Sequence, residues 1–196
     1  MTTAVLGSSL LQRSRVENGP NDLHHGLNVN EHGRTSLSVS QLAERTFLCD
    51  AMLGRLARWL RAAGYDTGLA TGHENDRVLI EAALAEDRLL LTLDRDFLEY
   101  KAARGCTLVL EGADLSAQAR ELKRTVGVDW LFRPFSRCVV DNAPLRPANK
   151  DERESLPTQV QDRGGAIASC PLCGRIYWTG DHHERMRKRL EDWGRS

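Results

Sequence analysis

An α/β fold is expected from this chain, with a parallel sheet flanked by helices and a smaller module at the C-terminus. Short apolar stretches alternate with amphipathic ones from Thr46 onward, which is the pattern of a parallel sheet connected by helices. The apolar run Leu89–Leu93 is bounded by charged residues, as is typical of a strand buried on both faces. From about Arg133 the composition shifts to more Pro, Gly and charge, and a Cys-x-x-Cys pair follows.

The expected elements follow one another in a regular order. Strands are expected at 46–49, 66–70, 88–93 and 106–110, and helices at 52–63, 76–85, 95–104 and 115–126. Gly64 ends the first helix, and Asn75 or Asp76 caps the second. This order places the α/β domain at residues 46–132 and the C-terminal module at 133–196.

Residues 1–45 differ in character from the rest of the chain. They carry little periodicity and much Asn, Ser, Gly and His. Such a segment cannot bury enough apolar surface to offset the entropy lost on ordering. We therefore expect a disordered N-terminal tail.

Charge and cysteine content bear on the binding partners and on the cellular compartment of the protein. Lys and Arg together number 27, as do Asp and Glu, so the bulk charge gives no argument for nucleic-acid or membrane binding. No apolar stretch is long enough to span a bilayer, and we expect no membrane partner. Five Cys, with two of them in a Cys-x-x-Cys pair, suit a reducing compartment, and we expect a cytosolic protein.

Carboxylates gather where two of the expected strands end. Asp50 follows the first strand, and Asp94 and Asp96 follow the third. If these strands are parallel, their carboxyl ends share one edge of the sheet, which Asp76 at a helix start is expected to face. Crowded carboxylates repel one another unless cations lie between them, and hard oxygen ligands suit Mg²⁺ or Mn²⁺. Two such ions can activate a water and stabilise the leaving oxygen of a phosphodiester, so the pattern indicates a metal-dependent nuclease.

Two alternative interpretations of these carboxylates apply. Asp94 and Asp96 can simply cap the helix that follows, since Asp is favoured at helix starts. A receiver domain with a phosphoacceptor Asp also carries acidic residues at its strand ends. Against a receiver domain, no Lys follows the last strand at 106–110, where the charge of the phosphate would need a partner.

Three arginines flank the apolar face of the first helix, close in sequence to Asp50. They are Arg55, Arg58 and Arg61. Beside an acidic metal site their guanidinium groups can hold phosphates by paired hydrogen bonds, whereas their ordinary role is a solvated helix face. Trp59 interrupts this face and is expected to pack in the core or against another domain rather than to stack on a base.

Three blocks of this sequence together resemble one family. The blocks are Phe47–Arg61, Gly64–Asp66 and Leu91–Asp96. They resemble the Mut-seven C-terminal RNase domain family, and the resemblance covers the chain from about Thr46 to the C-terminus. It implies a PIN-like fold, a divalent-metal site and cleavage of RNA, including tRNA or other structured RNA. It also places candidate metal ligands on Asp50, Asp76, Asp94 and Asp96.

A non-catalytic RNA-binding module is the alternative function. A pure binder has no physical reason to keep Asp50 and Asp94 crowded together, because their charges repel. Their presence therefore favours the nuclease.

The pair Cys170 and Cys173, followed by Gly174, has the spacing of a zinc knuckle, but it supplies only half a site. The resemblance implies a second pair at Cys138 and the position now held by Asp141. A carboxylate oxygen can also bind zinc, so Cys138, Asp141, Cys170 and Cys173 form a possible tetrahedral set. The alternative is that the ribbon folds without metal.

Residues 176–186 resemble the closing motif of the same family. Asp181 and Glu184 fit a capping box for a helix at 182–193, a helix rich in Arg and Lys. We expect Arg185 and His182 to contact RNA phosphates, although the helix can also be an ordinary polar surface.

Overall fold

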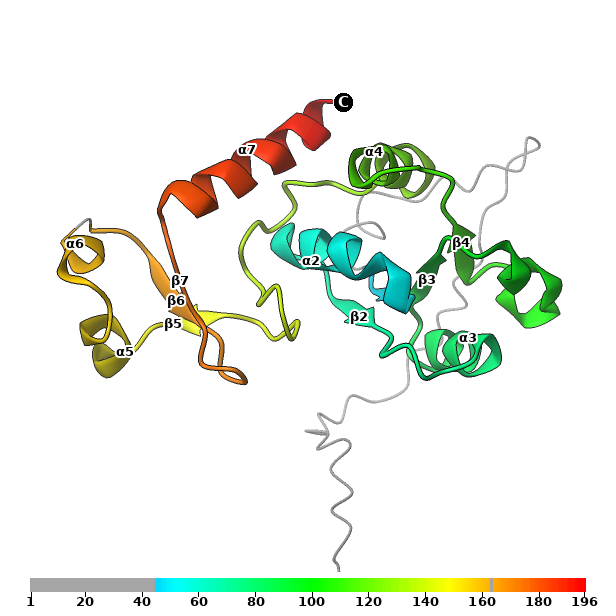
Figure 1. The fold of residues 1–196 in the computed structure, drawn as a ribbon, viewed down its shortest axis with the longest axis horizontal. Coiled ribbons are helices and arrows are strands. Elements are labelled where there is room, and N and C mark those ends of the chain that lie inside the picture. The colour runs from blue at the N-terminus through cyan, green and yellow to red at the C-terminus, as the bar shows by residue number, and fades with distance from the viewer. Residues whose placement is uncertain (1–44, 163) are drawn as a thin grey trace, which may run out of the picture. The chain divides into compact units, whose positions relative to one another are not determined.

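The computed structural model describes residues 45–162 and 164–196. Four short strands form a parallel sheet in the order β2-β1-β3-β4 (Figure 1). The strands are β1 Phe47–Cys49, β2 Thr67–Leu69, β3 Leu89–Thr92 and β4 Thr107–Val109. The expected parallel sheet is confirmed, whereas the expected tail at 1–45 lies, apart from Arg45, outside the described residues.

Helices follow each strand of this sheet. A single turn of 3₁₀ helix, η1 (Ala51–Leu53), leads into α2 (Gly54–Ala62), and α3 (Asp76–Ala85) and α4 (Leu115–Val126) lie where the sequence predicted them. The helix expected at 95–104 is instead two 3₁₀ turns, η2 (Arg95–Glu99) and η3 (Lys101–Ala103). Tyr100 between them has an extended backbone (φ −79°, ψ 117°), which interrupts the helical hydrogen bonds.

The helices bury both faces of the sheet. Leu91 belongs to a core that includes Leu56 and Leu60 of α2 and Leu122 of α4. The next residue along β3, Leu90, belongs to a second core with residues of α3 and with Phe97 of η2. Successive side chains of a strand point to opposite faces, so both faces of β3 are apolar and covered.

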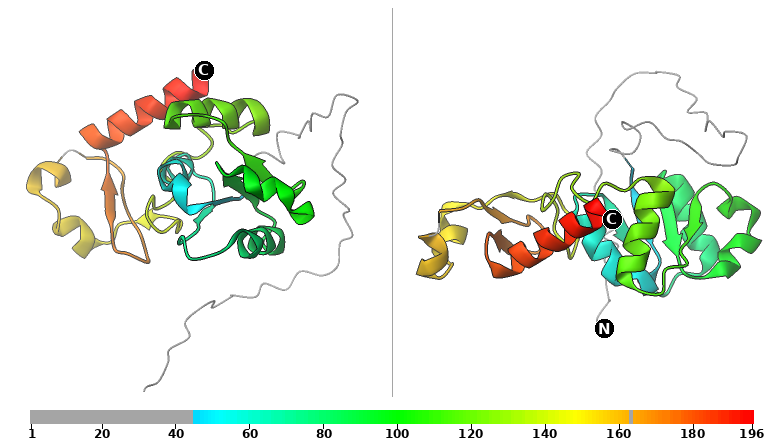
Figure 2. Two further views of the ribbon diagram at one scale, coloured as in Figure 1. Left: turned by 45° about the vertical axis from the view of Figure 1, so that its right-hand side comes forward. Right: turned by 90° about the horizontal axis from the view of Figure 1, so that it is seen from above.

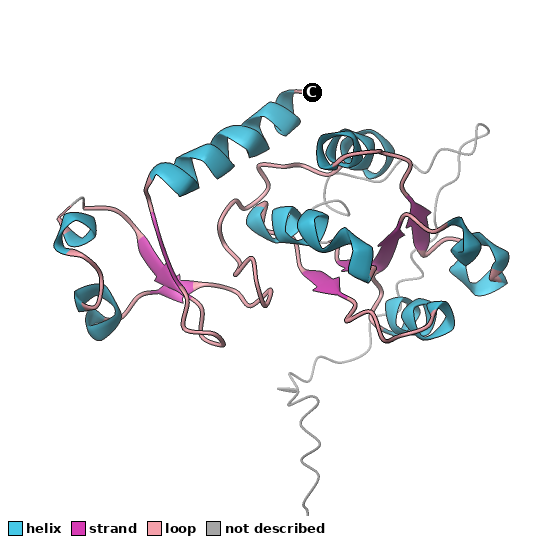
Figure 3. Cartoon of the chain, viewed as in Figure 1, coloured by secondary structure: helices cyan, strands magenta, loops and turns pink. Residues whose placement is uncertain are grey.

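The C-terminal module contains a small antiparallel sheet in the order β5-β6-β7 (Figure 3). Its strands are β5 Arg146–Pro147, β6 Ile167–Ser169 and β7 Ile176–Trp178, with α5 (Lys150–Glu154) and α6 (Thr158–Gln161) between the first two. The chain ends in α7 (Asp181–Arg195). The predicted combination of a parallel α/β sheet and a zinc-ribbon-like module is confirmed.

Helix α7 returns to the main core beside α4, as both views of Figure 2 show. Leu190 and Trp193 are buried there, and the Trp193 ring lies 5.0 Å from the rings of Trp59 and Trp130. Trp59 therefore has the packing role expected of it. The predicted capping box of this helix is wrong, because Gly180 occupies the N-cap without a side-chain bond and Asp181 is already helical. No helix of the described residues is long and apolar enough to cross a membrane.

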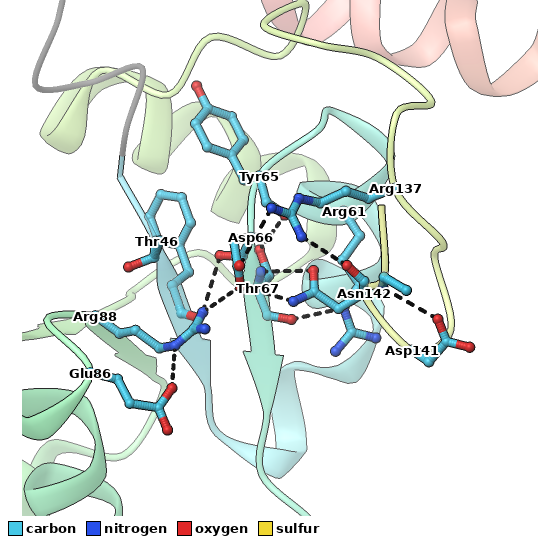
Figure 4. Close-up of polar contacts among 12 residues, drawn as sticks. Thr46, Arg61, Tyr65, Asp66, Thr67, Glu86, Arg88, Arg137, Asp141 and Asn142 are labelled. Atoms are coloured by element: carbon cyan, nitrogen blue, oxygen red, sulfur yellow. Dashed lines mark hydrogen bonds and ion pairs between the residues drawn. The ribbon is translucent and has the colours of Figure 1, made fainter. Parts of the chain in front are cut away.

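Arg61 joins α2 to the turn at residues 138–142, which carries Cys138 and Asp141 (Figure 4). Its side chain is only 5% exposed, and its Nε donates to the carbonyl oxygen of Thr67 at 2.8 Å. Its Nη1 donates to the carbonyl oxygen of Val140 at 2.6 Å. The predicted contact of Arg61 with RNA is therefore corrected to a structural role, because its guanidinium already serves buried carbonyl groups.

Replacing Arg61 by Met should destabilise the fold by about 2–4 kcal/mol, because one buried and one part-buried carbonyl group lose a charged donor. The free energy of unfolding in urea measures this loss. The matched control is Arg58→Met on the exposed side of the same helix, for which we expect a change within about 0.5 kcal/mol. Equal effects of the two substitutions would contradict the structural role of Arg61.

Candidate functional site

The carboxyl edge of the parallel sheet positions Asp50 and Asp94. Because β1 pairs with β3 in parallel register, with Cys49 opposite Leu91, the residues that follow these strands emerge side by side. The backbone N–H of Asp50 donates to the carbonyl oxygen of Leu91 at 2.9 Å, which continues the ladder up to the carboxylate.

A buried hydroxyl links the two carboxylate-bearing residues. Thr92, the last residue of β3, is fully buried and donates its hydroxyl to Oδ2 of Asp50 at 2.8 Å. The Oγ1 of Thr92 also accepts the backbone N–H of Asp94 at 3.0 Å. Thr92 thus fixes the orientation of the Asp50 carboxylate. The sequence analysis missed this residue, although a single hydroxyl within a run of Leu was a signal for it.

Asp94 also caps the turn that follows it. Its Oδ1 accepts the backbone N–H of Asp96 at 2.9 Å, so the capping interpretation holds for Asp94. This bond uses one oxygen of the carboxylate and holds the side chain in place beside Asp50. Asp96 itself lies exposed in the first turn of η2.

Asp76 belongs to the same acidic group. Asn75 is the N-cap of α3 and accepts the N–H of Val78 at 3.0 Å, so Asp76 is not needed as the cap. Burial raises the pKa of Asp76, and the neighbouring charges of Asp94, Asp50 and Asp96 raise it further. The charges of the other three carboxylates therefore act on Asp76, although the four sets of oxygen atoms are not gathered as closely as the ligand atoms of the C-terminal module.

The predicted RNA contacts lie on two helices. Arg55 and Arg58 are exposed on α2, the helix that starts just after Asp50. His182 and Arg185 are exposed on the first turns of α7. Within the described parts of the chain, no hydrogen bond or ion pair joins either α7 residue to the acidic edge.

The two cysteine-bearing turns of the C-terminal module have the same backbone geometry. The N–H of Gly174 donates to the carbonyl oxygen of Cys170 at 3.0 Å, and Gly174 has a φ of 68°. The N–H of Asn142 donates to the carbonyl oxygen of Cys138 at 3.0 Å, and Asn142 has a φ of 70°. Asn tolerates this left-handed conformation better than most residues, which explains why it replaces Gly here. Asp141 therefore occupies the position that Cys173 has in the other turn.

These turns bring four ligand atoms together. One atom from each of Cys138, Asp141, Cys170 and Cys173 lies within 4.8 Å of all the others, and this is the only such group found in residues 45–162 and 164–196. The sulfur atoms of Cys138 and Cys173 are 3.8 Å apart, which matches the separation of about 3.8 Å expected for two thiolates on one tetrahedral zinc. The cluster is thus consistent with a zinc site.

Hydrogen bonds organise this cluster. A carboxylate oxygen of Asp141 lies 3.2 Å from the sulfur of Cys170, and the thiol of Cys173 is the main cause of a pKa of Asp141 well below its usual range. Burial raises the pKa of Cys170 to about 11. The thiol of Cys170 thus keeps its proton beside the carboxylate, and a zinc ion would replace that proton.

Tyr177 supports the cluster from outside it. Its hydroxyl accepts the backbone N–H of Val139 at 3.3 Å and lies 3.1 Å from the sulfur of Cys138. A hydrogen bond from this hydroxyl would orient the sulfur toward the ion. The sequence analysis did not identify Tyr177, because its position on β7 is far from Cys138 in the chain.

Comparison with known proteins identifies the family. Residues 45–190 match the Mut7-C RNAse domain, which is most of the chain. The chain belongs to the Mut7-C RNase domain family. It is also 32% identical over 112 residues to the human exonuclease mut-7 homolog, covering 54% of this chain and 13% of that protein. No solved structure matches the chain.

This Mut7-C domain should carry about one zinc ion per chain after purification, as measured by elemental analysis. Asp141→Cys should tighten the binding, because a thiolate is a softer and stronger ligand for zinc, whereas Asp141→Ala should weaken it. Retention should fall as the pH drops, since the ligands must lose their protons to bind. A full complement of zinc that survives Asp141→Ala unchanged would show that Asp141 is not a ligand.

Proposed function

We propose that this chain is a metal-dependent ribonuclease that cleaves RNA phosphodiester bonds at the acidic edge of a PIN-like domain. The family supports a nuclease that acts on RNA. The observation that supports the proposal is the parallel register of β1 and β3, which brings Asp50 and Asp94 out at one edge with Thr92 bonded to both. Burial, and then the charges of Asp94, Asp50 and Asp96, raise the pKa of Asp76 at this edge. A group of carboxylates that destabilises its own charged state is suited to bind cations.

The donor set fits Mg²⁺ or Mn²⁺. Asp50, Asp94 and Asp96 would hold the ions through carboxylate oxygen atoms, which are the ligands that these metals prefer, and Asp76 would add negative charge nearby. When bound, such ions supply an activated water and stabilise the oxygen that leaves the phosphorus. Thr92 keeps the Asp50 carboxylate oriented. Arg55 and Arg58, which are exposed on α2, would hold phosphates of the RNA.

The remaining parts of the proposal concern the substrate and its surroundings. His182 and Arg185 are proposed as further phosphate contacts, and the substrate as RNA, including tRNA or other structured RNA.

A structural zinc in the C-terminal module would stabilise that module. All five cysteines are free thiols, which supports a reducing compartment, and we propose the cytosol.

Asp50→Asn and Asp94→Asn should each reduce cleavage at least about 100-fold, because each removes a charge that holds a metal ion at nearly constant side-chain volume. The assay uses purified protein on single-stranded RNA and on tRNA with Mg²⁺, Mn²⁺ or EDTA. Asp162→Asn, at an exposed residue away from the acidic edge, is the control and should keep wild-type activity. Binding of RNA without cleavage by the wild type would support the non-catalytic binding module instead.

Thr92→Val should lower the rate of cleavage about 10- to 100-fold at a fixed Mg²⁺ concentration, because the carboxylate of Asp50 loses its orienting hydroxyl. The same variant should need more Mg²⁺ for half-maximal rate. Thr92→Ser keeps the hydroxyl and should restore most of the activity, whereas a thermal midpoint that is unchanged in both variants excludes a general loss of structure. The idea fails if the Val and Ser variants have the same metal dependence.

A further inference from the structure

A basic pocket of about 460 Å³ lies at the edge of the sheet opposite to the acidic residues. Thr46, directly before β1, and Asp66, directly before β2, line it, whereas Asp50 and Asp94 follow the other ends of the strands. The rest of the lining comes from residue 45, residues 64–65 and the segment 132–144. These residues are Arg45, Gly64, Tyr65, Phe132, Arg133, Ser136, Arg137 and Pro144.

The pocket has an excess of positive charge. Its lining includes three arginines, Arg45, Arg133 and Arg137, and a single carboxylate, Asp66. Figure 4 shows that Asp66 is already engaged: Oδ1 accepts from Arg88 at 2.6 Å, and Oδ2 lies 3.4 Å from Arg137. Its charge is therefore balanced by partners that hold it in the wall. Arg45 has the charge of Asp87 nearby, whereas Arg133 forms no ion pair within residues 45–162 and 164–196, so Arg133 and part of the charge of Arg45 are left for a ligand.

The aromatic wall of the pocket holds Arg133 in place. The guanidinium of Arg133 lies 4.9 Å from the centre of the Phe132 ring, and that ring stacks on Tyr65 at 5.1 Å. Both rings are thus occupied by packing, so the wall offers no free surface for a nucleobase. The N–H groups of an arginine held flat on a ring remain available, and they match the oxygen atoms of a phosphate.

We propose that this pocket is a second phosphate-binding site, an exosite that holds the backbone of an RNA strand away from the acidic edge. Thr46 and Asp50 are four residue steps apart along extended chain, which corresponds to about 13 Å. Stacked nucleotides advance by about 3.4 Å each, so only RNA longer than about four nucleotides reaches both sites. The choice of RNA as the ligand rests on the proposed function, whereas the preference for phosphate rests on the pocket alone.

The exosite is tested by RNA binding without divalent metal, in the Asp50→Asn background so that no strand is cut. Fluorescence anisotropy compares a 4-nucleotide RNA with a 20-nucleotide RNA at several salt concentrations. Arg45→Ala with Arg133→Ala should weaken binding of the long RNA about 10-fold and reduce the salt slope by about 1.4, the value for two lost phosphate contacts on a single strand. Because no metal ion holds phosphate at the acidic edge here, the short RNA also depends on the pocket, and its binding should weaken by a similar factor.

The matched control is Arg104→Ala with Arg124→Ala, which removes the same charge from exposed positions outside the pocket. An equal loss of affinity in the control would show a bulk charge effect and overturn the exosite. Unchanged binding of both RNAs by the pocket variant would also overturn it. Poly-glutamate of matched charge is added as a competitor, and competition as strong as that of the long RNA would indicate an acidic protein partner instead.

The two proposals fail independently. If the wild type does not cleave RNA but the pocket variant loses binding of the long strand, the exosite stands and the nuclease proposal falls. If the wild type cleaves RNA and the pocket variant has the same KM for long RNA, the nuclease proposal stands and the exosite falls.

Discussion

The parallel pairing of β1 with β3 is the constraint on which the acidic site depends. These strands are adjacent in the sheet although a whole strand and two helices separate them in the chain, and only parallel neighbours end at the same edge. The backbone bond from Asp50 to Leu91 and the side-chain bond from Thr92 to Asp50 both follow from that pairing. Antiparallel pairing of the same residues would separate the carboxylates of Asp50 and Asp94 by the length of a strand.

Local sequence signals predicted the elements where local interactions decide the structure. The helix at 115–126 was predicted to the residue, because Asp114 caps its first turn and Gly127 ends it with a φ of 72°. The segment 95–104 was predicted as one helix, yet Tyr100 breaks it. The role of Arg61 was not predictable either. Its spacing places it on the helix, but its partners at Val139 and Val140 lie 78 and 79 residues further along the chain.

The fold holds the ligand atoms of the cysteine site closer together than the carboxylates of the acidic site. In the C-terminal module two matching turns and a supporting tyrosine bring the ligand atoms together within 4.8 Å. The described residues of the acidic edge hold no such cluster, and the Thr92 hydroxyl and backbone N–H groups are the bonds that orient Asp50 and Asp94 there. The sequence predicted both sets of candidate ligands, since motifs encode residue types, and the structure gathers the cysteine set. The supporting residues Thr92 and Tyr177 required the fold.

The network around Asp66 connects the C-terminal module to the amino ends of the strands. Asn142 donates to Oδ1 of Asp66 at 2.9 Å and accepts the backbone N–H of Thr67 at 3.0 Å, and its left-handed backbone completes the turn that carries Asp141. Asn142 therefore contributes both to the turn that carries Asp141 and to the start of β2. Hydrogen bonds from Arg88 and Asn142 outweigh the effect of burial and lower the pKa of Asp66, so the charge stays in place at neutral pH. That fixed charge neutralises Arg137 in the pocket wall and leaves Arg45 and Arg133 as the groups that give the amino edge its positive potential, opposite the negative carboxyl edge.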